Sequence, residues 1–194
     1  MEYLKITGGH AMNSLTKLQS ASFLFLDRDG VINRRIPDGY VTCWEEFAFL
    51  PGVLEAIAHL SNRFSKVVVV TNQQGVGKGL MSLQELDHIH DSMVQEIGKS
   101  GGRVDAVFYC TDTTDTENNC RKPGVALGLS AKSRFPEIEF DMSVMVGDSA
   151  SDMEFGRNLE MVNVFIGLDG EPPDCIHIDY QFESLKAFAE FCCD

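Results

Sequence analysis

The sequence lacks several features that would assign it to a particular class of protein. No run of apolar residues approaches the roughly 20 that a membrane-spanning helix needs, and no charged-then-apolar leader opens the chain. No cluster of basic residues offsets the formal net charge of −13, so nucleic acids and anionic membranes are unfavourable partners. The 6 cysteines lie too irregularly to suggest a disulfide framework. We therefore expect a protein of the reducing cytoplasm whose thiols are free.

What is present is ordinary for a folded protein. The chain has 194 residues, which suits one domain with a sizeable core, and 44% of its residues are apolar. No internal repeat, low-complexity tract or linker divides it. We expect a single domain over residues 21–194, preceded by a partly ordered extension over residues 1–20.

Five apolar segments are predicted to be strands. Their residues are continuously apolar rather than alternating, which is typical of strands buried on both faces of a parallel sheet. Helical patterns separate them, beginning after Gly52, Ser82 and Gly124 and spanning Ser149–Leu159 and Glu183–Cys192, with a capping box at Ser82 and Glu85. This alternation predicts an α/β fold. The five strand segments are Phe23–Leu26, Lys66–Thr71, Val104–Cys110, Met142–Gly147 and Val162–Ile166.

The first strand delivers two carboxylates. Asp27 and Asp29 follow Phe23–Leu26, and side chains two positions apart in a strand point the same way, so Arg28 should be turned away. Two crowded carboxylates repel each other unless a cation or a retained proton relieves them. Both possibilities suggest chemistry at this position.

Polar residues also follow the other strands. In an open α/β sheet, ligands bind beyond the carboxyl ends of the strands, so these residues should meet there. Each of them alone has an ordinary explanation, such as a turn or a solvated ion pair. Together they predict a phosphoryl-transfer site with three kinds of group. Asp27 and Asp148 are oxygen ligands suited to Mg²⁺, Lys122 and Arg121 are cations for a phosphate, and Thr71 and Asn72 are hydrogen-bonding groups.

These motifs resemble a known family. D27-x-D29-G-V, T71-N72, K122 and G147-D148-x-x-x-D152 match the motifs of the haloacid dehalogenase (HAD) superfamily. The segments LDRDGVIN, GYV, PGV, TNQQGVGKG and CRKPG are similar to its histidinol-phosphatase and D,D-heptose-bisphosphate phosphatase branch. The resemblance implies a three-layer, doubly wound, Rossmann-like sheet of order 5-4-1-2-3. The segments leave no room for a cap domain, so specificity would come from loops.

The resemblance also implies roles for the site residues. Asp27 would be the nucleophile that forms an aspartyl-phosphate, and Asp29 the general acid and base. Thr71 and Lys122 would orient and neutralise the phosphoryl group, and Lys122 would hold Asp27 ionised.

The metal in this family is Mg²⁺. The implied ligands are the Asp27 carboxylate, the Asp29 backbone carbonyl and the Asp148 carboxylate. Asp152 would orient Lys122 or a metal-bound water rather than contact the metal.

The substrate implied by the branch is a small phosphorylated metabolite, foremost D-glycero-D-manno-heptose 1,7-bisphosphate at its 7-phosphate. Histidinol phosphate and other small sugar phosphates are the alternatives, although Ser149 stands where heptose-specific members often have lysine. A scaffold that binds phosphate without turnover is the non-enzymatic alternative, and the net charge argues against a DNA-end phosphatase. The predicted substrate-binding residues are Asn72, Gln73, Arg121, Arg35 and Lys78.

One loop departs from the branch, whose members usually hold a structural zinc before the C-R-K-P segment. Cys110 and Cys120 are present, but Asp112 and Asn118 replace the other two ligands, so we expect no structural zinc. His59, His88 and His90 fall in helical segments and are predicted to be surface or packing residues. No apolar surface stripe is left unassigned, so we expect a monomer.

Overall fold

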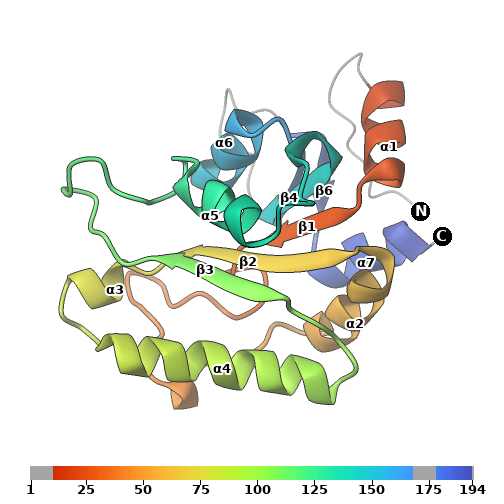
Figure 1. Cartoon of the computed structure of the whole chain (residues 1–194). Coiled ribbons are helices and arrows are strands. Elements are labelled where there is room, and N and C mark those ends of the chain that lie inside the picture. Colours follow the sequence, from red (N-terminus) through yellow and green to blue (C-terminus); the bar gives the residue numbers. More distant parts are fainter. Residues whose placement is uncertain (1–10, 168–177, 194) are drawn as a thin grey trace.

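The computed structural model describes residues 11–167 and 178–193 (Figure 1). Its helices are α1 (Ala11–Ser20), α2 (Val53–Arg63), α3 (Gln74–Gly77), α4 (Leu83–Lys99), α5 (Ala126–Arg134), α6 (Ala150–Asn158) and α7 (Leu185–Cys193), with 3₁₀ turns at Trp44–Glu46 and Phe140–Met142. Its strands are β1 (Phe23–Leu26), β2 (Lys66–Asn72), β3 (Ala106–Cys110), β4 (Ser143–Gly147), β5 (Val162–Ile166) and β6 (Tyr180–Phe182).

The strands form one parallel sheet of order β3-β2-β1-β4-β5-β6. The predicted α/β class is confirmed, and the first five strands follow the expected order read from the opposite edge. The sheet also has a sixth strand, β6, which pairs with β5 and was not predicted. Since β1 pairs with β2 on one side and β4 on the other, the connections reverse direction at β1 and β4. Ligands bind at such a reversal in doubly wound folds.

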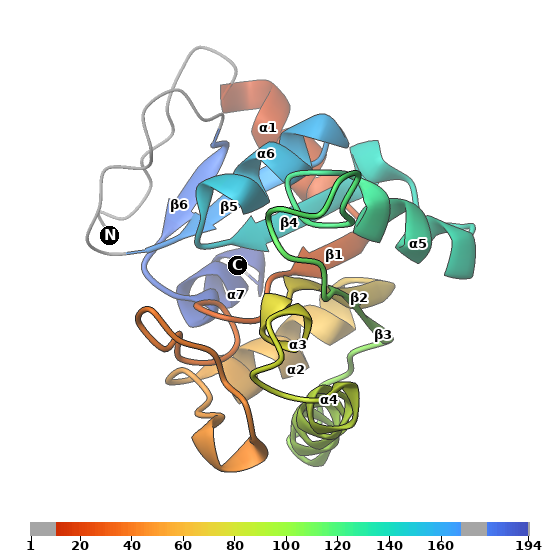
Figure 2. The ribbon, with the colours of Figure 1, turned by 90° about the vertical axis from the view of Figure 1, so that its left-hand side faces the viewer.

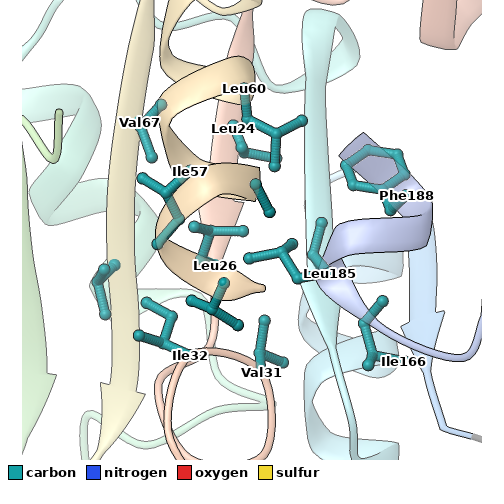
Figure 3. Close-up of a cluster of buried hydrophobic side chains, with 14 of the residues drawn as sticks. Leu24, Leu26, Val31, Ile32, Ile57, Leu60, Val67, Ile166, Leu185 and Phe188 are labelled. Carbon is teal, nitrogen blue, oxygen red and sulfur yellow. The ribbon is translucent and has the colours of Figure 1, made fainter. Parts of the chain in front are cut away.

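Helices cover both faces of the sheet. α2, α4 and α7 lie on one face, while α5 and α6 lie on the other (Figures 1 and 2). The alternation of strand side chains divides the core accordingly: Leu24 and Leu26 pack with the first group of helices, and Phe23 and Phe25 with the second. Figure 3 shows the first cluster, in which α2 presses its apolar face onto β1 and β2.

Strand burial follows position in the sheet. All residues of β1, β4 and β5 are buried, as their continuous apolar character predicts. Most residues of β3 are only partly buried, so the prediction of burial on both faces is wrong for that strand. The reason is that β3 is an edge strand, paired only with β2.

The predicted N-terminal extension contributes a helix. Residues 11–20 form α1, and Leu18 is buried in the main core cluster. The Arg63 guanidinium of α2 donates hydrogen bonds to the backbone carbonyls of Leu18, Gln19 and Ala21, which ties the end of α1 to the domain. Residues 1–10 and Cys175 lie outside the described part of the chain. Within residues 11–167 and 178–193, no helix is long and apolar enough to cross a membrane.

Candidate active site

The predicted site residues gather at the carboxyl ends of the strands, the side of the sheet that Figure 2 turns toward the viewer. They line a cavity of about 520 Å³. Its walls come from the segment after β1, the end of β2, the loop before α5 and the start of α6. Among the predicted residues, Asp27, Asp29, Arg35, Thr71, Asn72, Gln73, Arg121, Lys122 and Asp152 line it.

Lys122 is a buried cation at the floor of this cavity. Its Nζ lies 2.8 Å from Asp27 Oδ1, 2.6 Å from Asp152 Oδ1 and 2.7 Å from the carbonyl oxygen of Val70. Burial alone would lower the pKa of Lys122, but Asp152 and Asp27 raise it above the ordinary value, so the side chain stays charged. One ammonium therefore links the ends of β1, β2 and α6.

Asp152 takes part both in this ion pair and in the cap at the start of α6. Its Oδ1 lies at Lys122, while its Oδ2 accepts hydrogen bonds from the backbone N–H and the hydroxyl of Ser149. Ser149 and Asp152 form a reciprocal capping box that begins α6. Both carboxylate oxygens are thereby directed at protein groups.

Asn72 holds the backbone of Lys122. Its side-chain oxygen accepts from the Lys122 N–H at 2.9 Å, and its side-chain nitrogen donates to the Lys122 carbonyl at 3.1 Å. Both polar atoms of the Asn72 side chain are thus engaged with Lys122, and Asn72 also lines the cavity, so its use for substrate stays a prediction. In this arrangement it positions the lysine.

The turn after β1 brings the Asp29 region against Asp148. Gly30 has φ = +93°, and a Cβ atom at this position would lie 1.8 Å from Asp148 Oδ2. Glycine is required here both for the backbone conformation and for the close approach. The carboxylate of Asp148 therefore sits directly beside the turn that carries Asp29.

Asp27 and Asp148 form an acidic pair suited to a metal. Burial raises the pKa of Asp27 to about 6, while Lys122 opposes the rise. Burial and the nearby Asp27 raise the pKa of Asp148 to about 7, while Arg35 opposes it. Lys122 thus does not by itself keep Asp27 at an ordinary carboxyl pKa. A further cation would relieve the remaining repulsion.

The position of the Arg35 guanidinium shows which oxygens attract a cation. Its guanidinium nitrogen lies 2.6 Å from Asp148 Oδ1 and 3.3 Å from the backbone oxygen of Asp29. Oxygens of Asp27, Asp148 and Asp152 lie within 4.8 Å of one another. Carboxylate and carbonyl oxygens are the ligands that Mg²⁺ prefers, so the donor set fits this ion.

Asp29 is surrounded by hydrogen-bond donors. The Arg28 NH2 group donates to its Oδ1 and Oδ2 at 3.0 and 2.9 Å, Asn33 Nδ2 donates at 2.8 Å, and Gln73 Nε2 donates at 2.8 Å. Burial would raise the pKa of Asp29, but Arg28 and these hydrogen bonds hold it below the usual value. The expectation that Arg28 turns away is wrong: its side chain bends back onto Asp29.

Thr71 is the residue before the last in β2 and lines the cavity. Gln73 Nε2 donates to the Thr71 hydroxyl oxygen at 2.8 Å, and the Thr71 side chain is buried. Since that oxygen already accepts a hydrogen bond, its own proton remains to be donated, for example to a phosphoryl oxygen.

The remaining predicted residues lie at the mouth of the site. Arg121 lines the cavity and donates to the backbone oxygen of Asp112 at 3.1 Å. Lys78 does not line the cavity; its Nζ donates to the Tyr40 hydroxyl at 2.9 Å, and Tyr40 does line it. Any effect of Lys78 on a ligand would therefore pass through Tyr40.

Cys110 and Cys120 form a disulfide, so the prediction that all thiols are free is wrong for this pair. Asp112 accepts a hydrogen bond from the Cys120 backbone N–H inside the same loop. The two sulfurs and an Asp112 oxygen lie within 4.8 Å of one another. No spacing of cysteines in the sequence predicts this pair; the pairing follows from the fold, in which the end of β3 lies next to Cys120.

Two polar residues near the site were not predicted to act there. Arg28 and His90 are both buried, and Arg28 NH1 lies 3.1 Å from His90 Nε2. A signal for His90 exists in the sequence: with Leu86, Met93 and Ile97 it shares the spacing of one helix face, and those three residues are buried. A polar residue on an apolar face needs a buried partner.

Comparison with known proteins agrees with this geometry. The family model described as polynucleotide kinase 3 phosphatase matches residues 27–184. A curated D-glycero-alpha-D-manno-heptose-1,7-bisphosphate 7-phosphatase of Mycobacterium tuberculosis is 42% identical over 136 residues, covering 70% of this chain and 72% of the relative. A D-glycero-beta-D-manno-heptose-1,7-bisphosphate 7-phosphatase of Helicobacter pylori is 32% identical, covering 87% and 95%.

Solved structures show the same likeness. The crystal structure of D,D-heptose 1,7-bisphosphate phosphatase from B. bronchiseptica, in complex with magnesium and phosphate, superposes with a TM-score of 0.78 at 31% identity. The match covers 89% of this chain and 98% of that one. The chain therefore belongs to the polynucleotide kinase 3 phosphatase family of HAD phosphatases, in the branch that holds the heptose-bisphosphate phosphatases.

Proposed function

We propose that the protein is a phosphomonoesterase that removes the 7-phosphate of D-glycero-D-manno-heptose 1,7-bisphosphate through an aspartyl-phosphate on Asp27. The observation that carries this proposal is the buried Lys122 ammonium, held 2.8 Å from Asp27 at the floor of an open cavity. A cation beside a carboxylate at this place suits an anionic substrate that the carboxylate attacks. The heptose bisphosphate is proposed as the substrate because the similar proteins are named for it.

Asp27 would attack the phosphorus atom in line with the departing alcohol. Its pKa of about 6 leaves it largely ionised at neutral pH, and Lys122 would neutralise charge on the phosphoryl oxygens. The Thr71 hydroxyl would donate a hydrogen bond to one of these oxygens. Asn72 would fix the lysine through its backbone.

Asp29 would protonate the departing alcohol and then deprotonate the water that hydrolyses the aspartyl-phosphate. Its resting pKa is low because Arg28, Asn33 and Gln73 donate to it. A phosphate dianion arriving beside Asp29 would raise that pKa, because a like charge disfavours the ionised form. Substrate binding would thus prepare the acid.

Mg²⁺ would be held by the Asp27 and Asp148 carboxylates and the Asp29 backbone carbonyl. When bound, it would neutralise negative charge on the phosphoryl group and on the acidic pair. Arg35, which contacts two of these ligand groups, would then be released toward the cavity that it already lines.

Substrate selection would depend on loops, since residues 11–167 and 178–193 form one sheet with its helices and no separate cap. Arg35 and Arg121 both line the cavity and would meet the second phosphate of a bisphosphate. Gln73 would act through Asp29 and Thr71, and Lys78 through Tyr40.

The test is a panel of phosphate esters with Mg²⁺, ranked by kcat/KM. It contains both anomers of the heptose bisphosphate, histidinol phosphate, other sugar phosphates and a DNA 3′-phosphate end. We expect a heptose bisphosphate to rank first and Asp27→Asn to abolish turnover of every ester. Preference for another ester would overturn the substrate, and binding of phosphate without any turnover would leave the scaffold alternative.

We further propose a monomer of the cytoplasm with one domain over residues 21–194, an N-terminal extension over residues 1–20, and no nucleic-acid or membrane partner. The charge of −13 supports the last point, because it repels polyanions. The disulfide between Cys110 and Cys120 is the one observation against the cytoplasm among the described residues, because disulfides are rare where thiols are kept reduced, so the location is the part of this proposal that most needs the test. Light scattering of the purified chain and fractionation of cells that express it test the oligomeric state and the location.

A further inference from the structure

His90 of α4 reaches the site from outside the cavity. Its Nε2 lies 3.1 Å from NH1 of Arg28, which is 62 positions away in sequence. A guanidinium has donors but no acceptor, so Nε2 must accept this hydrogen bond and the ring proton must sit on Nδ1. Burial and the charge of Arg28 lower the pKa of His90 to about 3, which keeps the ring neutral at physiological pH.

The imidazole ring is itself held in place. It packs against the ring of Tyr109 in β3, with centroids 5.2 Å apart, and the Tyr109 hydroxyl donates to Asp87 of α4 at 2.8 Å. His90 is 4% exposed. Contacts from α4 and β3 therefore hold the acceptor atom Nε2 in a fixed position.

Arg28 connects this fixed point to Asp29. The Arg28 side chain is 1% exposed, with NH1 at His90 and NH2 at both oxygens of Asp29. A guanidinium is planar, so holding NH1 restricts where NH2 can point. Without an acceptor at NH1, this buried cation would lose one partner and could rotate or draw in water.

Asp29 is held by three side chains, of which Arg28 carries the positive charge. Asn33 donates to Oδ1 and Gln73 to Oδ2, while one Arg28 nitrogen meets both oxygens. Of these three partners, Arg28 is the charged donor and the one that meets both oxygens, so it makes the strongest contribution to the direction of the carboxylate. A general acid must point at the departing oxygen, and an error of about 1 Å in position costs on the order of 100-fold in rate.

We propose that His90 is a positioning residue for the acid/base carboxylate: its unprotonated Nε2 fixes the Arg28 guanidinium, and the guanidinium aims Asp29. This inference rests on the proposed function, because it takes Asp29 as the proton donor to the departing alcohol. His90 contacts neither substrate nor metal ligand. Its effect passes through Arg28.

Two substrates separate this role from a merely structural one. An alkyl phosphate needs a proton on its departing oxygen, whereas 4-nitrophenolate leaves readily without one. The kcat/KM value reports the steps up to departure of the alcohol or phenol. A misdirected Asp29 therefore lowers kcat/KM for the heptose bisphosphate and spares that for 4-nitrophenyl phosphate.

Three variants complete the experiment. His90→Leu keeps an apolar side chain but no acceptor, and we expect kcat/KM for the heptose bisphosphate to fall by ~10-fold or more, a part of the ~10²–10⁴-fold that general acid catalysis contributes. His90→Gln offers its side-chain oxygen to Arg28 and should restore most of the loss. His88 is an exposed position on the same helix, so His88→Gln should leave kcat/KM unchanged for both substrates.

The ratio of the two kcat/KM values does not depend on how much of a variant is folded, so poor folding of His90→Leu does not hide the result. An equal fall for both substrates, no fall for either, or a His90→Gln variant no better than His90→Leu would overturn the proposal. If the wild-type protein hydrolyses no phosphate ester, the proposed function itself fails. If the wild type is active and His90→Leu has the same ratio as the wild type, the proposed role of His90 fails while the proposed function stands.

Discussion

The disulfide between Cys110 and Cys120 gives a prediction with a magnitude that follows from the structure. Breaking it releases a loop with a sequence separation of 10. By the chain-entropy relation, a crosslink that closes a loop of this length stabilises the folded state by about 3 kcal/mol. For a domain of this size, about 3 kcal/mol corresponds to a fall in Tm of roughly 6–12 °C.

The assay compares protein purified without reductant before and after treatment with a dithiol. Of the 6 cysteines, the disulfide pair should be silent, so thiol titration in denaturant should give four thiols before reduction, Cys175 included. The Tm should fall on reduction, and Cys110→Ala with Cys120→Ala should reproduce the fall without reductant. Cys43→Ser, at a cysteine that is free in the structure, is the matched control.

The catalytic consequence should be small. Cys120 lies two positions before Lys122, but the lysine is held by Asn72 and by its ion pairs rather than by the loop. We expect kcat/KM to change little on reduction. Six titratable thiols with one zinc per chain would refute the disulfide and the zinc-free loop together, and four thiols with an unchanged Tm would refute the entropic argument.

Three further changes test the site. Lys122→Met should abolish activity and destabilise the fold by about 3–5 kcal/mol, because two buried carboxylates lose their shared cation; denaturant unfolding measures the second effect. Gly30→Ala should weaken Mg²⁺ binding in calorimetry and cost about 1–3 kcal/mol of stability, since its φ is +93° and its Cβ would meet Asp148. The pKa of His90 is lower in the folded state than in the unfolded state, so the contribution of His90 to the unfolding free energy should fall by about 1.4 kcal/mol per unit as pH drops from about 6.5 toward 3. The raised pKa values of Asp27 and Asp148 act in the opposite direction, so this contribution is measured as the difference in slope between the wild type and a His90 variant. His90→Gln should remove this slope, whereas an unchanged slope in His90→Gln or a lost slope in His88→Gln would contradict the assignment.

The sequence predicts the sheet well because buried parallel strands are continuously apolar. The bounds of β1 and β5 agree with their apolar runs, and the capping box at Ser82 begins α4 as expected. β6 escaped prediction because Tyr180–Phe182 is too short to form a run. Its strand character comes from pairing with β5, which no local pattern records.

The site was predictable as a set of residues but not as a set of contacts. Periodicity places Asp27 after β1 and Lys122 in the loop after β3, at the same edge of the sheet, and their chemistry suggests why they meet. It does not reveal that the side chain of Asn72 hydrogen-bonds the backbone of Lys122, or that Arg28 folds back onto Asp29. Such contacts depend on long side chains and on partners far apart in sequence, such as His90.

The two hydrogen bonds between the Asn72 side chain and the backbone of Lys122 have a consequence for the loop that precedes the lysine. They attach Lys122 to the end of β2. The segment between Cys110 and Cys120 is therefore not needed to hold Lys122 in position. A change in the crosslink or the length of this segment would therefore leave the two hydrogen bonds that hold Lys122 in place. The position of Lys122 is thereby compatible with a disulfide or with free cysteines in the loop that precedes it.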